Sequence, residues 1–321
     1  MKKTVFILIL FFSVISCRKN DYPDLDFKQE MRDFVIGISE YSRLSDPDFI
    51  IIPQNGIELI TINGEEEGSL SESYLAAITG HGQEDLFYGY NDDDQETPAG
   101  DNTYLRTFLD RSKNNGNTIL VTDYCYTQSK MSDSYSRNNS SGYISFAANH
   151  RELDNIPAFP NPIYGENASI ITSLSQVKNF LYLINPENFS SKTGFINAIT
   201  STNYDLLIMD LFFDETTEFS AAEVAQLKSK ANGGKRLVIS YMSIGEAEDY
   251  RYYWQSGWET GDPFWLDDEN RDWGGNYKVR YWEPEWKKII FGYEDSYTKK
   301  IINAGFDGVY MDIIDAFEYF E

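Results

Sequence analysis

The chain has 321 residues and a mass of 37.0 kDa, and 41% of its residues are hydrophobic and 16% aromatic, a composition that excludes a disordered protein. Lysine and arginine number 27 against 51 aspartate and glutamate, a net charge of −24, which disfavours binding to a nucleic-acid backbone. Two histidines and two cysteines are too few for a zinc finger, a disulfide scaffold or an iron–sulfur cluster.

The first segment carries the pattern of an export signal. Two lysines precede an apolar stretch that ends at Ser16, and Cys17 follows. The stretch is shorter than the about 20 residues that span a bilayer, and its layout is typical of a signal peptide. Residues 14–17 read Val-Ile-Ser-Cys and resemble a bacterial lipoprotein cleavage box. We therefore expect residues 1–16 to be removed, Cys17 to be lipidated and residues 17–26 to form a tether, with a plain secretory signal as the alternative.

Short β-branched or apolar runs recur along the rest of the chain, and helix-period segments lie between several of them. The expected strands are residues 49–53, a weaker run around 77–78, and then 118–124, 180–184, 205–211, 236–245, 278–282 and 308–314. The expected helices are residues 27–41, 104–113, 221–231 and 286–303. Ser220 followed by Glu223 predicts a capping box at the start of the third helix. Apolar strands alternating with helices indicate a parallel sheet covered on both faces.

Eight such strands predict an α/β fold of the (β/α)8 TIM-barrel type as a single domain over residues 27–321, with an open doubly wound sheet as the alternative. Acids or amides stand at the ends of several strands: Asn55, Glu84, Asp123, Asp210, Glu246 and Asp312. The carboxyl ends of all barrel strands meet at one face, so these side chains predict a mouth lined with carboxylates. For any one of them alone, a helix cap or a loop hydrogen bond is an equally good explanation.

Two strings in the second half of the chain are specific enough to indicate a family. Residues 245–251 read GEAEDYR and residues 305–316 read GFDGVYMDIIDA. Over residues from about 178 to 321, the sequence resembles the endo-α-1,4-polygalactosaminidase-like proteins, glycoside hydrolase family 114, and their extracellular relatives.

The order of the resembling segments is unusual. Segments that ordinarily follow these strings in the family resemble residues 34–41, 49–56, 80–88, 118–124 and 142–146, which here come first. The resemblance therefore implies a circularly permuted barrel, in which the strand at 49–53 lies beside the strand at 308–314 and runs parallel to it. A truncated domain is the alternative.

The resemblance also implies roles for individual residues. Glycoside hydrolysis needs two carboxyl groups across the scissile bond, and the matched motifs indicate Asp312 as nucleophile or base and Glu84 as general acid. Further substrate-binding candidates are Asp210, Asn55, Tyr241, Glu246, Glu248, Arg251, Trp273, Tyr277 and Trp282. A purely structural charge network explains the acids and the arginine of GEAEDYR equally well, and core packing is the default role of each aromatic residue. No P-loop, dinucleotide fingerprint, HExxH or nucleophile elbow occurs, so no cofactor and no metal is expected.

These features together predict a glycoside hydrolase that cleaves an amino-sugar-containing α-glycan and is lipid-anchored to the cell envelope, on a periplasmic or surface face. Its expected partners are a polysaccharide or oligosaccharide and, through Cys17, the membrane. A polymer of deacetylated galactosamine is cationic and would be attracted to an acidic cleft, although the acidity explains solubility equally well. The alternatives are a non-catalytic carbohydrate-binding lipoprotein on the same barrel and an enzyme that acts on another polymer, such as a peptidoglycan or capsule fragment.

Overall fold

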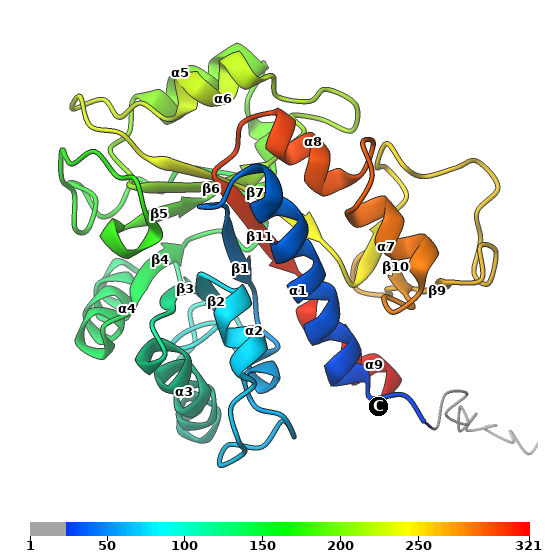
Figure 1. The fold of residues 1–321 in the computed structure, drawn as a ribbon. Coiled ribbons are helices and arrows are strands. Elements are labelled where there is room, and N and C mark those ends of the chain that lie inside the picture. Colours follow the sequence, from blue (N-terminus) through cyan, green and yellow to red (C-terminus); the bar gives the residue numbers. More distant parts are fainter. Residues whose placement is uncertain (1–23) are drawn as a thin grey trace, which may run out of the picture.

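The computed structural model describes residues 24–321, so the expected signal peptide, Cys17 and most of the tether lie outside the described residues. Within that range the strands form a parallel core with the helices around it (Figure 1). The parallel strands are β1 (Ile50–Pro53), β2 (Gly80–Glu84), β3 (Thr118–Tyr124), β4 (Ile144–Ala148), β5 (Phe180–Tyr182), β6 (Leu206–Asp210), β7 (Leu237–Ser243) and β11 (Gly308–Asp312). None of the helices between residues 24 and 321 combines the length and the apolar character that crossing a bilayer requires.

Most helices lie between these strands in sequence, but α1 precedes β1 and α9 follows β11. They are α1 (Phe27–Ser45), α2 (Glu72–Ala77), α3 (Ala99–Asn114), α4 (Gln128–Ser141), α5 (Lys192–Thr200), α6 (Ala221–Leu227), α7 (Pro284–Ile290), α8 (Tyr297–Asn303) and α9 (Phe317–Phe320). Short 3₁₀ segments are η1 (Ile57–Ile60), η2 (Leu174–Gln176), η3 (Pro186–Asn188) and η4 (Ile314–Ala316). The side chains buried between helices and strands belong to one continuous hydrophobic cluster, as expected for an α/β fold.

The parallel strands pair in two sheets, with the orders β1-β11-β7-β6-β5 and β2-β3-β4. A single parallel bridge between Gln54 and Gly82 connects the sheets where β1 meets β2. At the other edges, β4 and β5 share no ladder within the described range, but the rings of Phe146 and Phe180 are 5.8 Å apart. The sequence-based prediction is thus confirmed in a coarser form, as an α/β fold with parallel sheets, and the strands of residues 24–321 do not pair into one closed barrel.

The predicted neighbourhood of the first and last parallel strands is confirmed. Strand β1 pairs with β11 in parallel, from Ile50 opposite Gly308 to Pro53 opposite Met311. A Cβ atom at Gly308 would lie 2.2 Å from the carbonyl oxygen of Ile50, so this close pairing requires glycine. Helix α1, which precedes β1, also contacts α9 and the last residue, which follow β11.

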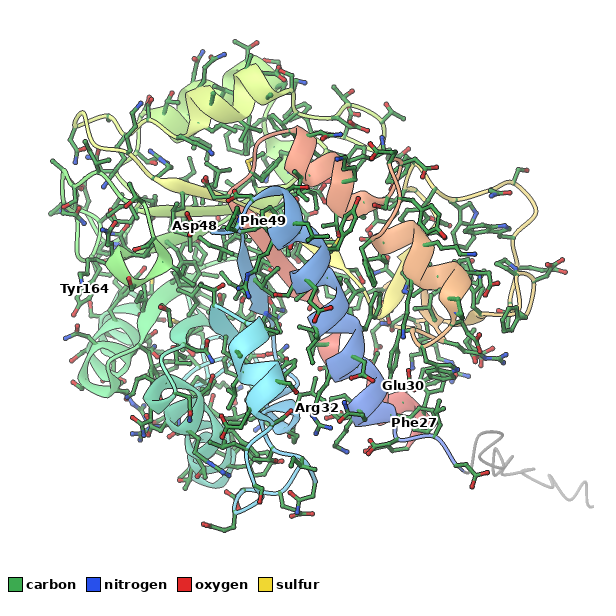
Figure 2. The ribbon with its side chains drawn as sticks, viewed as in Figure 1. Phe27, Glu30, Arg32, Asp48, Phe49 and Tyr164 are labelled. Carbon is green, nitrogen blue, oxygen red and sulfur yellow. The ribbon has the colours of Figure 1, made fainter. Side chains whose placement is uncertain are left out.

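Helix α1 begins beside the C-terminal end of the chain (Figure 1). Lys28 Nζ lies 2.6 Å from Glu321 Oε1, and the rings of Phe27 and Phe320 are 5.6 Å apart. Arg32, labelled on α1 in Figure 2, is fully buried and donates from Nε to the carbonyl oxygen of Leu59 at 2.8 Å. These contacts fix α1 against η1 and the last helix, in front of the strand pair β1–β11.

Two expected parallel strands are wrong, and one parallel strand was not expected. The weak run around 77–78 falls at the end of α2, and the strand is β2, which begins at Gly80. The run at 278–282 is not part of the parallel core: strand β10 (Asn276–Val279) pairs antiparallel with β8 (Glu246–Glu248) and β9 (Leu266–Glu269) in a separate small sheet. Its alternating polar and apolar residues suit a strand with one wet face. The missing parallel strand is β4, whose small residues and serine carry a weak strand propensity.

One helix prediction is changed by local chemistry, one is confirmed, and one helix was not expected. The expected helix at 286–303 is divided into α7 and α8, because Gly292 lies between them with a φ of 93° that a continuing helix does not allow. The predicted capping box is confirmed: Ser220 Oγ accepts from the Glu223 amide, and the Glu223 carboxylate accepts from the Ser220 amide at 2.8 Å. Helix α4, rich in serine and asparagine, was not expected and forms by burying one face that includes Met131.

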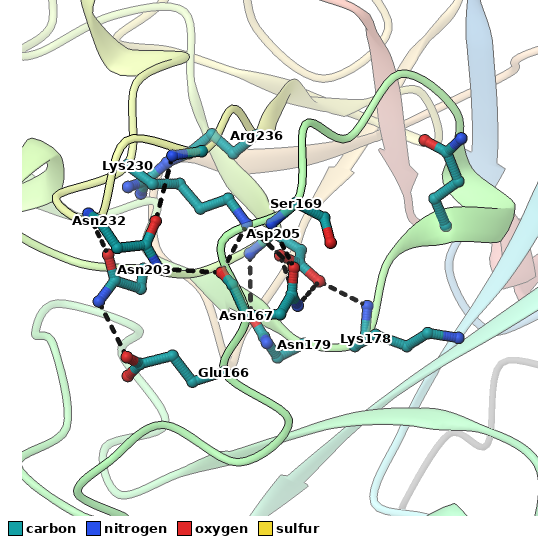
Figure 3. Close-up of polar contacts among 12 residues, drawn as sticks. Glu166, Asn167, Ser169, Lys178, Asn179, Asn203, Asp205, Lys230, Asn232 and Arg236 are labelled. Carbon is teal, nitrogen blue, oxygen red and sulfur yellow. Dashed lines mark hydrogen bonds and ion pairs between the residues drawn. The ribbon is translucent and has the colours of Figure 1, made fainter.

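A buried charge pair lies just before β6, at the amino ends of the strands. The side chains of Asp205 and Lys230 are fully buried and meet at 2.6 Å. Asn167 Nδ2 and the Lys178 amide each donate to Asp205 Oδ2 at 2.9 Å, as Figure 3 shows. Every charge here has a partner, so the cluster fixes the loop between β4 and β5 to the bottom of the sheet.

Candidate active site

A cleft with a cavity volume of about 320 Å³ opens at the opposite, carboxyl ends of the parallel strands. Eight of the residues predicted from the sequence line it together: Asn55, Glu84, Asp210, Tyr241, Glu246, Arg251, Trp273 and Asp312. Asp123, another strand-end acid, is instead fully buried and accepts hydrogen bonds from the amides of Phe87 and Tyr88. The cleft therefore collects most of the predicted polar strand ends at one face.

The two predicted catalytic carboxylates share one hydrogen-bond donor. Gln54, the residue after β1, donates from Nε2 to Glu84 Oε2 at 2.7 Å and to Asp312 Oδ1 at 3.1 Å. Its Oε1 accepts from the hydroxyl of Tyr182 at 3.0 Å, which orients the amide so that the NH₂ group faces the carboxylates. The structure thus brings Glu84 and Asp312, 228 positions apart in the numbering, to the two sides of a single amide group.

Glu84 ends β2 and is half-buried in the cleft wall. Tyr124 donates from its hydroxyl to Glu84 Oε1, and Asn55 Nδ2 donates to Oε2 at 3.2 Å. Burial, together with the nearby charge of Asp312, raises the pKa of Glu84 to about 7, although the hydrogen bonds from Tyr124 and Asn55 act in the opposite direction. A carboxyl group with this pKa holds a proton for an appreciable part of the time at neutral pH.

Asp312 ends β11 and accepts two further hydrogen bonds. Tyr241 donates from its hydroxyl to Oδ2 at 2.7 Å, and the backbone N–H of Ile313 donates to Oδ1 at 2.8 Å. Burial raises the pKa of Asp312, and these two donors counteract the rise because they stabilise the charged form. The two carboxyl groups therefore differ in their surroundings, and the charge of Asp312 is itself one reason why Glu84 retains its proton.

The three strand ends that meet here share a backbone conformation. A left-handed residue follows each site residue: Asn55 (φ 61°) after Gln54, Asp85 (φ 57°) after Glu84, and Ile313 (φ 58°) after Asp312. Asparagine and aspartate tolerate this region, but a β-branched isoleucine does so only under strain. Such strain is maintained only when the surroundings enforce it, and here it turns the chain so that the carboxylates face each other.

Asp210, Arg251 and Glu248 form a second charged group, of which Asp210 and Arg251 line the cleft. Arg251 binds Asp210 with both terminal nitrogens, at 3.0 and 2.7 Å, and binds Glu248 Oε2 through Nε at 2.6 Å. All three side chains are buried, and burial raises the pKa of Asp210 whereas the charge of Arg251 lowers it. Glu248 does not line the cleft. The bidentate geometry fixes Arg251 at the cleft surface.

Glu246 lies in the cleft wall apart from that group. Gly245 precedes it, and a Cβ atom at Gly245 would lie 2.2 Å from the carbonyl oxygen of Ile313. Glycine therefore allows the turn after β7 to approach the Asp312 strand end and places Glu246 beside it. Asn270 Nδ2 donates to Glu246 Oε1 at 2.9 Å. Burial is the main cause of a raised pKa at Glu246, and the charge of Asp312 adds to it.

The predicted aromatic residues are divided between the cleft and the core. Trp273 is 56% exposed and lines the cleft, so its ring is available for stacking on a sugar face. Tyr277 packs against Trp254 at 4.9 Å, and Trp282 packs against Phe27 at 5.1 Å. Neither Tyr277 nor Trp282 is among the residues that line the cleft.

The cleft is also lined by residues that were not singled out from the sequence, and four of them bear on the carboxyl pair: Gln54, Tyr124, Tyr182 and Asp315. Gln54, Tyr124 and Tyr182 end or follow strands and make the hydrogen bonds described above. Asp315, three residues after Asp312, also lines the cleft, and burial together with the charge of Asp312 raises its pKa to about 7. Its place in the string DIIDA was the available signal. Glutamine and tyrosine at strand ends carry none, because both are common in ordinary strands.

No group of three or more histidine, cysteine, aspartate or glutamate side chains suited to a metal ion occurs between residues 24 and 321. The carboxylates in the cleft instead face amides, hydroxyls and arginines.

Parallel α/β folds with polar side chains at the carboxyl ends of the strands form a large class of enzymes, and a facing carboxyl pair is the arrangement of glycoside hydrolases. Residues 184–321 match the model of glycoside hydrolase family GH114, so the family predicted from the motifs is confirmed over this region. Asp312 lies inside the matched region and Glu84 outside it.

The similar proteins include an uncharacterized protein, MJ1477, of Methanocaldococcus jannaschii, which is 43% identical over 158 residues, covering 48% of this chain and 42% of the relative. An uncharacterized protein of Deinococcus radiodurans is 45% identical over 123 residues, 38% of this chain and 37% of the relative. One of Thermotoga maritima is 42% identical over 123 residues, 38% and 36%. The chain thus matches less than half of the length of each of these relatives.

Proposed function

We propose that the protein is a glycoside hydrolase that cleaves an amino-sugar-containing α-glycan, with Glu84 as general acid and Asp312 as nucleophile. The observation that carries the proposal is the pair of carboxyl groups bound to one Gln54 amide. Glu84, with a pKa of about 7, can protonate the leaving oxygen. Asp312, stabilised in its charged form by Tyr241 and the Ile313 amide, can attack the anomeric carbon.

The spacing of the pair favours retention of configuration. Oxygens of Glu84 and Asp312 lie 2.7 and 3.1 Å from the same nitrogen, so they are less than about 6 Å apart, close to the about 5–5.5 Å of retaining enzymes. Inverting enzymes need about 6.5–9.5 Å to admit a water molecule. In the retaining route Asp312 forms a glycosyl ester while Glu84 protonates the departing oxygen. Glu84 then takes a proton from the water that cleaves the ester.

Charge in the cleft supports a cationic substrate. Both arginines that line it are already paired: Arg251 with Asp210 and Glu248, and Arg151 with Asp85 and Asp93. Five other lining acids form no ion pair within residues 24–321: Glu84, Glu152, Glu246, Asp312 and Asp315. The charge of Lys278 acts on one of them, Glu246. The excess negative charge would attract a glycan that carries free amino groups.

The shape of the cleft supports cleavage inside a polymer. A neighbouring hollow shares Asn55, Glu84 and Asp315 with the cleft and continues past them to Glu58, Asp101 and Glu318. A bound chain can therefore extend on both sides of Glu84, and both arms of the groove carry carboxylates. This supports an endo-acting enzyme of the polygalactosaminidase type.

The test is reducing-end release from a galactosamine polymer by the wild type, Asp312→Asn and Glu84→Gln. We expect each variant to lose about 10³-fold or more in kcat, with the fold intact. Glu285→Gln, which removes one exposed charge on α7, is the control and should stay within about twofold of the wild type. Turnover that survives both substitutions would remove the catalytic assignment, and binding without wild-type turnover would favour a carbohydrate-binding protein.

We also propose that the strands form a circularly permuted (β/α)8 arrangement. The parallel pairing of β1 with β11 and the contact of α1 with the last helix support it, because α1 then occupies the position of a helix that connects these two strands.

Finally, we propose that the protein is exported and lipid-anchored to the cell envelope through Cys17, on the strength of its first 17 residues. Replacement of Cys17 by serine should move the protein from the membrane fraction to the soluble fraction and abolish labelling by a fatty-acid analogue. Unchanged fractionation and unchanged labelling would contradict the anchor.

A further inference from the structure

Arg151, in the loop after β4, binds the loop that follows β2. Its Nη2 and Nη1 atoms donate to the two carboxylate oxygens of Asp85, at 2.9 and 3.3 Å, and its Nε atom donates to Asp93 Oδ1 at 2.7 Å. Nη2 also donates to the carbonyl oxygen of Gly89 at 3.0 Å. A Cβ atom at Gly89 would lie 2.0 Å from Asp85 Oδ1, so the loop closes around this ion pair because residue 89 is a glycine. One guanidinium therefore fixes the loop with charge-assisted hydrogen bonds.

The same guanidinium lies on the ring of Tyr124, at the end of β3. The central carbon of the guanidinium is 3.8 Å from the ring centre, well within the about 6 Å over which a cation–π contact acts. Tyr124 is buried, and its hydroxyl donates to Glu84 Oε1. The ring cannot turn away from Glu84 without losing its contact with the guanidinium. Arg151 therefore holds the direction of a hydroxyl that Glu84 accepts.

Asp85 and Tyr124 are the two groups through which Arg151 reaches the proposed general acid. Asp85 has a φ of 57° and turns the chain directly after Glu84, whereas Tyr124 holds one oxygen of the Glu84 carboxyl. Within residues 24–321, no hydrogen bond or ion pair joins Arg151 to Glu84 itself. Any effect of Arg151 on Glu84 must therefore pass through these two neighbours.

We infer that Arg151 is a positioning residue for the general acid, which clamps Asp85 and Tyr124 and thereby fixes the direction of the Glu84 carboxyl. This rests on the proposed function and adds a residue to the same site. A general acid must lie within hydrogen-bond reach of the oxygen that it protonates, and a misplacement of about 1 Å can cost about 100-fold in rate. Lysine at position 151 would keep the charge but lose the planar fork and the stacked face.

The surroundings of Glu84 make the clamp measurable as a pKa. The charges of Asp85 and Asp312 raise the pKa of Glu84, whereas the hydrogen bond from Tyr124 lowers it. Arg151→Lys keeps a positive charge beside Asp85 but loosens Tyr124, so the pKa of Glu84 should rise. Asp85→Asn removes a negative charge and should lower it. Two further titratable groups that interact with Glu84 stay neutral, because burial raises their pKa well above the usual value: Tyr182 and Tyr310.

The experiment measures kcat and KM of Arg151→Lys on a galactosamine polymer and follows the labelled Glu84 carboxyl carbon in an NMR titration. The signal is assigned by its loss in Glu84→Gln. We expect kcat to fall about 10- to 100-fold with KM within about twofold of the wild type, and the pKa of Glu84 to rise by about 0.5–1 unit. In a Tyr124→Phe background the same substitution should cost much less, because the hydroxyl that Arg151 positions is absent.

Arg137 on α4 provides a matched control. Its guanidinium lies 4.4 Å from the ring centre of Phe87, and it pairs with Glu96 at 2.6 Å and Asp133 at 3.5 Å. The side chains of Arg137 and Arg151 are both 33% exposed, but Arg137 does not line the cleft. Arg137→Lys should leave kcat within about twofold of the wild type and the pKa of Glu84 unchanged.

The NMR titration separates this inference from the proposed function. If the wild type cleaves no galactosamine polymer but the pKa of Glu84 still rises in Arg151→Lys and falls in Asp85→Asn, the proposed function fails and the clamp stands. An unchanged pKa of Glu84 in Arg151→Lys would overturn the positioning role. A loss of kcat that is as large in the Tyr124→Phe background as in the wild type would also overturn it, because a purely structural ion pair gives that result.

Discussion

The two ends of the parallel strands carry buried acids in different electrostatic surroundings. At the amino end, Asp205 meets Lys230 at 2.6 Å and accepts further hydrogen bonds, so its charge is balanced. At the carboxyl end, Asp210 holds an arginine at the edge of a cleft in which Glu84 and Asp312 have no cation partner among residues 24–321. A buried acid that is paired with a cation holds parts of the fold together. Burial without a cation partner instead raises the pKa of a carboxyl group into the range that suits acid–base catalysis.

The largest effect is expected when the charge of Glu84 is removed and both stability and turnover are measured. Burial raises the pKa of Glu84 to about 7, above its unfolded value of about 4.3. Its contribution to the free energy of unfolding is therefore full below about pH 4 and is lost as the pH rises through about 7. Glu84→Gln should lose about 10³-fold in kcat, yet its melting temperature relative to wild type should increase from pH 4 to pH 8. A variant that is destabilised to the same extent at every pH would show that Glu84 is a structural acid.

At the amino ends of the strands we expect the reverse, a loss of stability with little change in turnover. Asp205→Asn leaves Lys230 buried without a counter-charge, and we expect about 3–5 kcal/mol of lost stability, measured by denaturant unfolding. At temperatures where the variant is folded, kcat should stay close to wild type. Adding Lys230→Met removes the orphaned charge and should restore part of the loss. A large change in kcat without loss of stability would contradict the division between the two ends.

The next prediction concerns Gln54, whose side-chain amide donates to both carboxylates. Gln54→Met removes the N–H group that stabilises negative charge on both carboxylates, so both pKa values should rise and the pH profile should move to higher pH by about one unit, with a fall of about 10- to 100-fold in kcat. Tyr182→Phe removes only the hydroxyl that orients the amide and should give a smaller shift in the same direction.

Asp315→Asn tests whether Asp315, whose pKa is also about 7, determines the alkaline limb of the pH profile of kcat instead of Glu84.

The smallest effect is expected from moving the chain ends. A rearranged chain that runs from residue 161 to 321 and then from 24 to 160 reconnects the last helix to α1, which it already contacts. The new break falls in an exposed stretch of the loop between β4 and β5, near Tyr164, which is labelled in Figure 2. The ring of Tyr164 stacks on that of Tyr135. We expect activity within a few-fold of wild type and a melting temperature within about 5 °C. An insoluble product would contradict the proposed permutation.

Most of the parallel core was predictable, because long apolar runs such as 118–124 and 236–245 leave few alternatives to a buried strand. The pairing of β1 with β11 followed from motif order. Strand β4 was not predictable, since Ile144, Ser145 and Phe146 form too short a pattern, and β10 shows that a good strand sequence does not specify which sheet it joins. The division of the parallel strands into two sheets depends on packing between β4 and β5, which no local pattern encodes.

The site was predictable where a charged residue ends a strand and not where a neutral one does. Glu84 and Asp312 stand out in their motifs, but their relation depends on Gln54, whose amide contacts both. The sequence also does not reveal that Trp282 packs against Phe27, or that Glu248 faces Arg251 behind the cleft wall. Such roles depend on the side to which a residue points after a turn, as at Gln54, Glu84 and Asp312, each of which is followed by a left-handed residue.

The close approach of Gly245 to the Ile313 carbonyl has a consequence for how such proteins can diverge. Any side chain at position 245 must push away the strained backbone that orients Asp312, so the two motifs cannot drift independently although 67 positions separate them. We expect natural variants that lose this glycine either to carry a compensating change near 313 or to have abandoned turnover, and a survey of homologous genes would distinguish these fates.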